Sequence, residues 1–179
     1  MRIISGKFKS KRITAPKKLP IRPTTDIAKE GLFNILNNTY NFTELNVLDL
    51  FAGSGNICYE FASRGCSQIT AVDKHYNCIK FINQTSSALG IQINTIKKDV
   101  YTYLKSANQS FNLIFADPPY DFTIDQFEEI VQLVFDQKHL KEDEGVLIIE
   151  HPKTTPLSSL AYFSDERRYG GSVFSFFKK

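Results

Sequence analysis

The sequence predicts an α/β protein built on a doubly wound, mainly parallel sheet. The first observation is that short apolar runs, which suit buried strands, alternate through most of the chain with longer segments of helical periodicity. The second is a turn with two glycines directly after an apolar run, a position where such sheets bind ligands. The third is size, because 179 residues, 42% of them hydrophobic, suit one globular unit with a full core.

The chain begins with a basic segment. Residues 1–23 contain eight Lys and Arg residues and no Asp or Glu, whereas the remaining residues contain 14 basic and 19 acidic ones. Two short β-compatible pieces within residues 2–15 surround a turn with Gly and Ser, which predicts a hairpin. A basic segment on an acidic body usually contacts phosphates, so we expect this arm to bind RNA; a solvated arm without a ligand is the alternative. The candidate RNA-binding residues are Lys7, Lys9, Lys11, Arg12 and Arg22.

An extended connection over residues 16–23 leads to the first expected helix. Pro23 and the Thr-Thr-Asp sequence after it suit a helix start, because hydroxyl and carboxylate oxygens can cap the exposed amides of a first turn. Apolar residues follow at helical spacing until Asn37 and Asn38, where we expect the helix to end. We place the boundary between the arm, residues 1–23, and the main domain, residues 24–179, at this helix.

The rest of the chain divides into strands and helices in turn. Gly65 and Gly90 each follow a helical segment, as glycine commonly does at a helix end. The expected strands are residues 47–51, 68–72, 91–97, 111–116, 145–149, 160–163 and 172–177. The expected helices are residues 57–64, 75–89, 100–104 and 123–135. This alternation favours one doubly wound sheet.

The first of these strands carries a candidate cofactor loop. Asp49 lies in the strand, and Gly53 and Gly55 follow it in a turn that lets a ligand come close to the backbone. A dinucleotide fingerprint would have a third glycine where this chain has Cys58. Since Asp49 would repel a diphosphate, the loop suits a ligand with positive charge, such as S-adenosylmethionine, better than NAD. The candidate cofactor-binding residues here are Asp49, Phe51, Ala52, Gly53 and Gly55.

Each of the next two expected strands is followed by an aspartate. Asp73 comes 18 residues after Gly55, where a carboxylate can accept hydrogen bonds from two ribose hydroxyls; capping of the helix from His75 is the alternative. Asp99, with its neighbour Val100, lies where a side chain can meet an adenine amino group; capping of the next helix is the alternative. Acidic residues at three strand ends indicate a nucleotide-type site more strongly than any one of them.

The expected strand over residues 111–116 leads into Asp117-Pro118-Pro119-Tyr120. Prolines cannot donate to a sheet ladder, so the strand must end here and the backbone that leaves it is stiff. Asp117 is thereby held at the edge of the sheet where ligands bind in open α/β proteins. A proline turn with a capping aspartate and a half-buried tyrosine is the alternative.

Several motifs of this chain resemble those of one enzyme family. Asp49-Leu50-Phe51-Ala52-Gly53-Ser54-Gly55 and Asp117-Pro118-Pro119-Tyr120 resemble the cofactor and catalytic motifs of S-adenosylmethionine-dependent amino methyltransferases. Further motifs follow in family order: Arg2-Ile3-Ile4-Ser5-Gly6-Lys7, Arg22-Pro23-Thr24-Thr25-Asp26, Arg64-Gly65, Glu150-His151 and Tyr169-Gly170. With them, nearly the whole chain resembles the bacterial small-subunit ribosomal RNA guanine-N2 methyltransferases.

The resemblance implies a Rossmann-like class I methyltransferase fold with S-adenosylmethionine as cofactor. It implies methylation of the N2 amine of a guanine in 16S ribosomal RNA, free or in an assembling small ribosomal subunit. Asp117 and the carbonyl of Pro118 would accept hydrogen bonds from the two N–H groups of that amine and direct its lone pair toward the methyl donor. Tyr120 would stack on the flipped base, with Pro119 and Phe122 beside it; core packing is the alternative for Phe122.

Other classes of protein fit less well. No apolar stretch is long enough to span a bilayer and the basic start lacks a signal-peptide core, so we expect a cytoplasmic protein that does not bind membranes. Cys58, Cys66 and Cys78 lack Cys-x-x-Cys spacing, so we expect neither a metal nor a disulfide framework, and we expect a monomer. An adenine-N6 methyltransferase of DNA or RNA, or a non-catalytic RNA-binding module, are the alternatives. A nicotinamide oxidoreductase is disfavoured by the missing third glycine.

Overall fold

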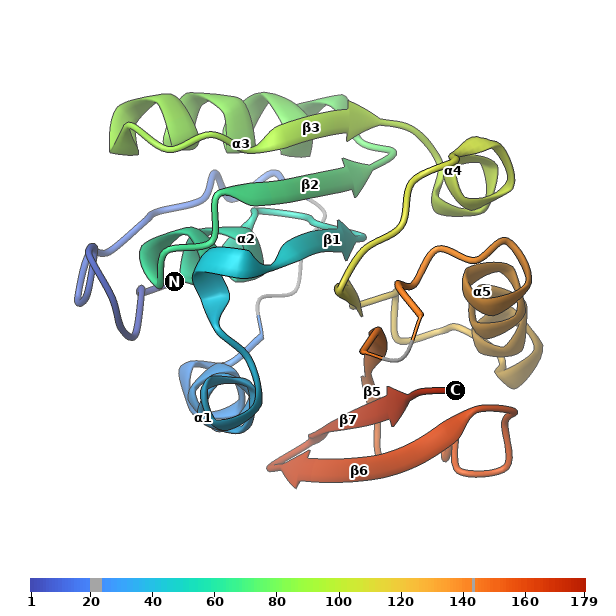
Figure 1. The fold of residues 1–179 in the computed structure, drawn as a ribbon. Coiled ribbons are helices and arrows are strands. Elements are labelled where there is room, and N and C mark those ends of the chain that lie inside the picture. The colour runs from blue at the N-terminus through green and yellow to red at the C-terminus, as the bar shows by residue number, and fades with distance from the viewer. Residues whose placement is uncertain (20–23, 143) are drawn as a thin grey trace.

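A computed structural model describes residues 1–19, 24–142 and 144–179 of the chain. Residues 20–23 of the expected connection, which include the RNA-binding candidate Arg22, therefore lie outside the described residues. Within the described residues the strands form a single sheet in the order β3-β2-β1-β4-β5-β7-β6 (Figure 1). The strands are β1 (Asn46–Leu50), β2 (Gln68–Asp73), β3 (Asn94–Lys97), β4 (Leu113–Ala116), β5 (Val146–Pro152), β6 (Phe163–Tyr169) and β7 (Ser172–Phe177).

The first five strands pair in parallel, and the chain reverses after β5. The strand order turns at β1, because β2 and β3 lie on one side of it and β4 and β5 on the other. Strands β7 and β6 then extend the sheet as an antiparallel hairpin. The expected doubly wound, mainly parallel α/β sheet is confirmed, with the switch between the two halves at β1 and β4.

Helices cover both faces of this sheet. The helices are α1 (Asp26–Thr39), α2 (Asn56–Ser63), α3 (Tyr76–Leu89), α4 (Val100–Ser106) and α5 (Ile124–Asp136). Side chains of α1, α2 and α3 form one core with one face of the strands, and side chains of α4 and α5 form a second core with the other face. Both faces of the central strands are therefore buried, which explains why β1 and β4 read as continuous apolar runs rather than alternating ones.

The element prediction is wrong for the strand expected over residues 160–163. Residues 160–162 form a turn rather than a strand, and the strand begins at Phe163 and runs through an exposed, charged sequence to Tyr169. This strand lies at the edge of the sheet, where only one side pairs and polar side chains face water. Its sequence therefore lacks the apolar pattern from which strands are predicted.

The basic arm packs along α2. Where we expected a hairpin, Arg2 and Arg12 form an isolated antiparallel bridge, and backbone bonds on either side of it join residues 1–3 to residues 10–13. Two residues of this segment, Ile3 and Ile13, are buried and pack against Tyr59 of α2. The arm is thus held to the main domain by its own apolar side chains, while its basic side chains stay exposed.

No helix in the described parts of the chain is long and apolar enough to cross a membrane.

Candidate active site

A cavity of about 740 Å³ opens at the carboxyl ends of the parallel strands. This is the edge where open α/β sheets bind ligands, and the volume lies in the usual range for small-molecule sites. The predicted residues that line it are Asp49, Phe51, Ala52, Gly53, Asp73, Asp99, Val100, Asp117, Pro118, Pro119, Tyr120 and Phe122. The structure therefore brings the glycine loop and the Asp-Pro-Pro-Tyr segment to one pocket.

The loop after β1 makes a tight turn on strained backbone. Phe51 has a φ of 61°, a conformation that costs a non-glycine residue about 1–3 kcal/mol and that is found most often at functional sites. Gly53 and Gly55 also have positive φ, and Gly55 caps the start of α2. A Cβ atom on Gly55 would lie 2.8 Å from the Tyr59 ring, so only glycine fits. Gly55 shapes the loop from behind, whereas Gly53 lines the cavity.

Asp73 ties this loop to the next helix. One carboxylate oxygen accepts a hydrogen bond from the Gly53 amide at 2.8 Å, and the other accepts one from the His75 amide at 2.8 Å. The alternative for Asp73 was a cap of this helix, but its contact is to the residue that precedes α3, and no side chain caps the helix itself. A carboxylate offers about four acceptor positions, so the same side chain can also accept hydroxyl groups of a ligand.

Asp49 is a buried carboxylate at the end of β1. The Cys58 thiol, which stands where a dinucleotide fingerprint has its third glycine, donates to Asp49 Oδ2 at 3.0 Å. Burial raises the pKa of Asp49 to about 7, and the nearby Asp73 charge adds to the effect, while the thiol contact opposes it. An ionised carboxylate here would be stabilised by a cationic group in the cavity.

Asp99 and Val100 start α4 beside the same cavity. Asp99 caps the helix, because its Oδ1 accepts hydrogen bonds from the Thr102 amide at 3.1 Å and from the Thr102 hydroxyl at 3.3 Å. Val100 is buried and lines the cavity next to it. The capping alternative is therefore present for Asp99. Both of its bonds to Thr102 use Oδ1, so the cap does not involve Oδ2.

The Asp-Pro-Pro-Tyr segment forms the opposite wall of the cavity. Asp117 is half-buried directly after β4, with its amide 3.4 Å from the Leu50 carbonyl, and Pro118 is buried behind it. Pro119 and Tyr120 are exposed at the opening. The segment therefore presents one carboxylate inside the cavity and one aromatic ring at its mouth.

Phe122 packs against the core and also lines the cavity. Its ring lies edge-on to Phe51 at 5.6 Å and to Phe127 at 5.8 Å, within the core on the α5 side of the sheet. It also lines the cavity. Phe122 thus supports the strained loop at Phe51 while forming part of the pocket surface.

Further polar residues that were not predicted as site residues line the cavity, and two of them, Thr24 and Glu150, form a pair. The Thr24 hydroxyl donates to the Glu150 carboxylate at 2.7 Å, and both residues are buried. Thr24 precedes α1 and Glu150 lies in β5, 126 positions apart in sequence. The Thr-Thr-Asp sequence reads as a helix cap and Glu150 as the end of a strand, so only the tertiary contact reveals their place in the pocket.

The four described basic candidates lie outside this cavity. Lys7, Lys9, Lys11 and Arg12 are exposed on the arm, and the backbone amide of Lys7 donates to the Ser63 carbonyl at the far end of α2. Since α2 rises about 1.5 Å per residue, that end of the helix is about 10 Å from its start beside the cavity. The basic groups are thus placed to contact a long ligand rather than a small one.

The chain is similar in sequence to a protein family and to a named enzyme. The family described as "Conserved hypothetical protein 95" matches residues 1–178. The "Ribosomal RNA small subunit methyltransferase D" of Buchnera aphidicola subsp. Baizongia pistaciae is 31% identical over 155 residues, which are 86% of this chain and 77% of that protein.

Two solved structures share the fold. A hypothetical protein of Thermus thermophilus superposes with a TM-score of 0.85 at 23% identity and covers 100% of this chain and 99% of that one. The 16S rRNA N2 methyltransferase of the same species, solved in complex with AdoMet and guanosine, superposes with a TM-score of 0.71 at 18% identity. That match covers 90% of this chain and 45% of the other.

Proposed function

The chain belongs to the family described as conserved hypothetical protein 95, and on that premise we propose that it methylates the N2 amine of a guanine in 16S ribosomal RNA. It is a methyltransferase that uses S-adenosylmethionine as its methyl donor. Ribosomal RNA as substrate rests on the named relative, and an exocyclic amine as the acceptor rests on the chemistry of the Asp-Pro-Pro-Tyr segment. Guanine N2 in particular rests on the resemblance of the chain's motifs to those of the guanine-N2 methyltransferases. The single observation that carries the proposal is that this segment and the glycine loop line one cavity.

The residues on the cofactor side suit S-adenosylmethionine. This cofactor supplies a methyl group on a positively charged sulfur and carries an ammonium group as well. In this proposal Asp49 attracts the positive charge, Asp73 accepts hydrogen bonds from ribose hydroxyl groups and Asp99 accepts one from the adenine amine. The proposal is supported by the fact that all three line the cavity. The backbone at Gly53 has no side chain to keep a ligand away.

The residues on the substrate side suit an exocyclic amine. The lone pair of such an amine is delocalised into the base, which makes it a weak nucleophile. Asp117 accepts a hydrogen bond from one N–H group and the carbonyl of Pro118 accepts one from the other, so that the lone pair is localised and aimed at the methyl group. Tyr120 at the mouth of the cavity stacks on the extruded base, and Pro119 and Phe122 border it.

The basic arm completes the substrate site in this proposal. Lys7, Lys9, Lys11 and Arg12 bind RNA phosphates outside the cavity, while residues 24–179 carry the chemistry. Ribosomal RNA, free or in an assembling subunit, is long enough to reach both. The proposal also includes Arg22, which belongs to the same basic segment of the sequence.

Nucleoside mass spectrometry after incubation with isotopically labelled cofactor tests the proposal. We expect labelled N2-methylguanosine from 16S ribosomal RNA, loss of at least a thousandfold in kcat for Asp117→Ala, and cofactor affinity unchanged in that variant. Asp121→Ala is the matched control, because this neighbouring aspartate is exposed and does not line the cavity. Labelled N6-methyladenosine would instead identify an adenine methyltransferase, and loss of cofactor binding in Asp117→Ala would move Asp117 to the cofactor side.

A further inference from the structure

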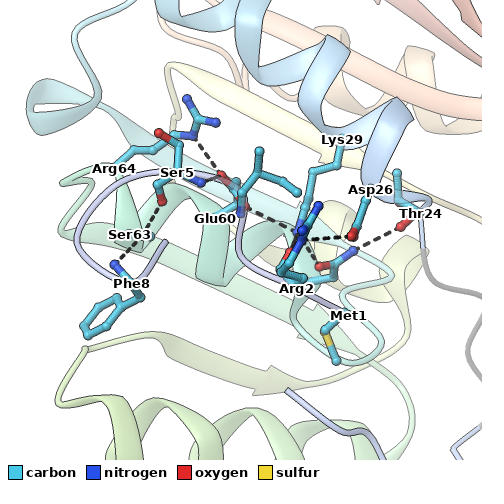
Figure 2. Close-up of polar contacts among 12 residues, drawn as sticks. Met1, Arg2, Ser5, Phe8, Thr24, Asp26, Lys29, Glu60, Ser63 and Arg64 are labelled. Atoms are coloured by element: carbon cyan, nitrogen blue, oxygen red, sulfur yellow. Dashed lines mark hydrogen bonds and ion pairs between the residues drawn. The ribbon is translucent and has the colours of Figure 1, made fainter. Parts of the chain in front are cut away.

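A buried chain of polar contacts joins the basic arm to the wall of the cavity. Its centre is the ion pair between Lys29 of α1 and Glu60 of α2, whose side chains are both 0% exposed. Figure 2 shows Lys29 lying between Glu60 on one side and Thr24 on the other. Neither charged residue lines the cavity, and the chemistry proposed above uses neither of them.

Glu60 holds the arm through its backbone. Its two carboxylate oxygens accept hydrogen bonds from the Ile4 amide at 2.8 Å and from the Ser5 amide at 3.1 Å. Arg64, one turn further along α2, donates to the same carboxylate at 3.0 Å. Since the contacts are to amides rather than side chains, they fix the register of the arm on the helix independently of its sequence.

Lys29 contacts three different parts of the molecule. Its ammonium donates to the Arg2 carbonyl at 2.7 Å and to Asn56 Oδ1 at 2.8 Å, and it lies 3.3 Å from Glu60 Oε2. An ammonium group has three donors, so these three partners match its full capacity. Burial lowers the pKa of Lys29, and the Glu60 charge opposes that shift.

The contacts continue from Lys29 into the cavity. Asn56, the first residue of α2, donates from its amide nitrogen to the Thr24 carbonyl at 3.3 Å. The Thr24 hydroxyl in turn donates to Glu150. Asn56, Thr24 and Glu150 all line the cavity, so this series of polar contacts is continuous from the backbone of the arm to the surface of the pocket.

The location of this ion pair argues for a role other than stability. Removing two charges from water is costly, and in other proteins apolar residues of similar volume often replace such a pair without loss of stability. The specific contribution of the pair here is geometric, because its hydrogen bonds, apart from the one between Glu60 and Arg64, fix either the arm or the pocket wall. Figure 2 shows these contacts gathered where the arm crosses the start of α1.

We propose that Lys29 and Glu60 are positioning residues that couple the docking of the basic arm to the arrangement of Thr24 and Glu150 in the cavity. The inference rests on the proposed function, in which the arm binds RNA while the cavity holds the target base. Docking of the arm on α2 and formation of the pocket wall are, in this proposal, one event. Disruption of the pair must therefore disturb both.

The test is a double variant, Lys29→Met/Glu60→Met, which removes both charges of the buried pair. Arg64 also loses its carboxylate partner, but its side chain is 10% exposed and lies over the Phe33 ring. Lys105→Met/Glu129→Met is the matched control, because this pair is an exposed ion pair of α4 and α5 at 2.9 Å that does not line the cavity. Hydrogen–deuterium exchange of the cofactor-free protein should rise at least tenfold in residues 2–8 and also in residues 24–30. The control should match the wild type in both segments. Faster exchange in residues 2–8 alone, or in neither segment, would overturn the coupling.

Kinetics on ribosomal RNA give the second readout. We expect kcat at saturating RNA to fall at least tenfold in the double variant, with cofactor affinity within threefold of the wild-type value. A raised KM with unchanged kcat would mean that the pair only tethers the arm, and that result overturns the proposal. If the wild type itself fails to methylate RNA, the proposed function fails, while the exchange measurement still decides whether the arm and the pocket wall are coupled.

Discussion

The charge of Asp49 should control cofactor affinity at acidic pH. Burial raises the pKa of this carboxyl to about 7, so in the empty protein it is largely protonated below that pH. A cationic ligand favours the ionised form, so binding displaces a proton there. Affinity for S-adenosylmethionine should therefore fall as the pH drops from 7 to 5.5, approaching about tenfold per pH unit, as linkage requires for one displaced proton. Titration calorimetry in buffers of different ionisation enthalpy measures both the affinity and the proton release.

The control for this prediction is Asp49→Asn, which keeps the shape and cannot ionise. It should bind the cofactor more weakly at pH 7 and show little pH dependence between pH 5.5 and 7. If the variant keeps the wild-type slope, a group other than Asp49 is responsible for the pH dependence.

Stacking on the ring of Tyr120 should contribute much of the binding free energy of the target base. It lines the cavity at its mouth and is 39% exposed, so it is accessible to a base from outside. Base–aromatic stacking contributes about 1–3 kcal/mol. Tyr120→Ala should therefore lower kcat/KM for RNA by roughly fivefold to 150-fold at unchanged cofactor affinity. Tyr120→Phe keeps the ring and should retain most of the activity; an equal loss in both variants would assign the effect to the hydroxyl group.

At the scale of single residues, the sequence predicts the side chains whose chemistry depends on local spacing. The aspartates at three strand ends and the Asp-Pro-Pro-Tyr segment reach the cavity because parallel strands end at one edge. Thr24, Glu150 and Lys29 escape prediction because their partners lie 126, 126 and 31 positions away and no local pattern marks them. Asp99 shows a further limit, since a capping residue and a ligand-binding residue have the same local sequence.

Docking of the arm as an element should depend on Gly6. This glycine has a φ of 82°, and a Cβ atom on it would lie 1.9 Å from the Ser63 carbonyl oxygen of α2. Gly6→Ala must therefore lift the turn from the helix and weaken the neighbouring bonds of Lys7 and Phe8 to Ser63, at 2.7 and 2.9 Å. Limited trypsin digestion should cut this variant after Lys7, Lys9 and Lys11 faster than the wild type.

Gly170→Ala is the matched control for that prediction. Gly170 has a similar φ of 63° but would bring a Cβ atom into open space, so its substitution carries the cost of positive φ, about 1–2 kcal/mol, without a collision. Its arm should be digested at the wild-type rate. Equal digestion of the two variants would show that the contact at Ser63 does not hold the arm.

The elements that the sequence predicts well are those buried on both faces or marked by caps. The start of α1 at Thr25 and the end of α3 at Gly90 follow from capping residues. Strand β4 follows from an unbroken apolar run and β1 from an apolar run that contains Asp49. The edge strand β6 was missed because its residues face water and are charged. The arm was expected as a hairpin, and backbone bonds do join residues 1–3 to residues 10–13. Other amides of the arm bond to α2, which a local pattern cannot reveal.

At the scale of the whole molecule, the distribution of charge should determine how RNA binding responds to salt. The arm carries its exposed basic groups on a body with a net negative charge, and single-stranded nucleic acids release about 0.7 counterions per phosphate contact. Replacing Lys7, Lys9, Lys11 and Arg12 together by Ala should therefore weaken binding of a 16S ribosomal RNA fragment. The slope of log affinity against log salt should become shallower by up to about 3 in a filter-binding titration.

A second quadruple variant separates location from net charge. Lys138, Lys141, Lys178 and Lys179 are exposed around a hollow near the amino ends of β4 and β5, at the opposite edge of the sheet from the cavity. Replacing them by Ala removes the same charge, but the slope should stay at the wild-type value because no RNA that enters the cavity from the arm side needs to pass them. If both variants flatten the slope equally, the protein attracts RNA through its overall charge and the arm has no special part in binding.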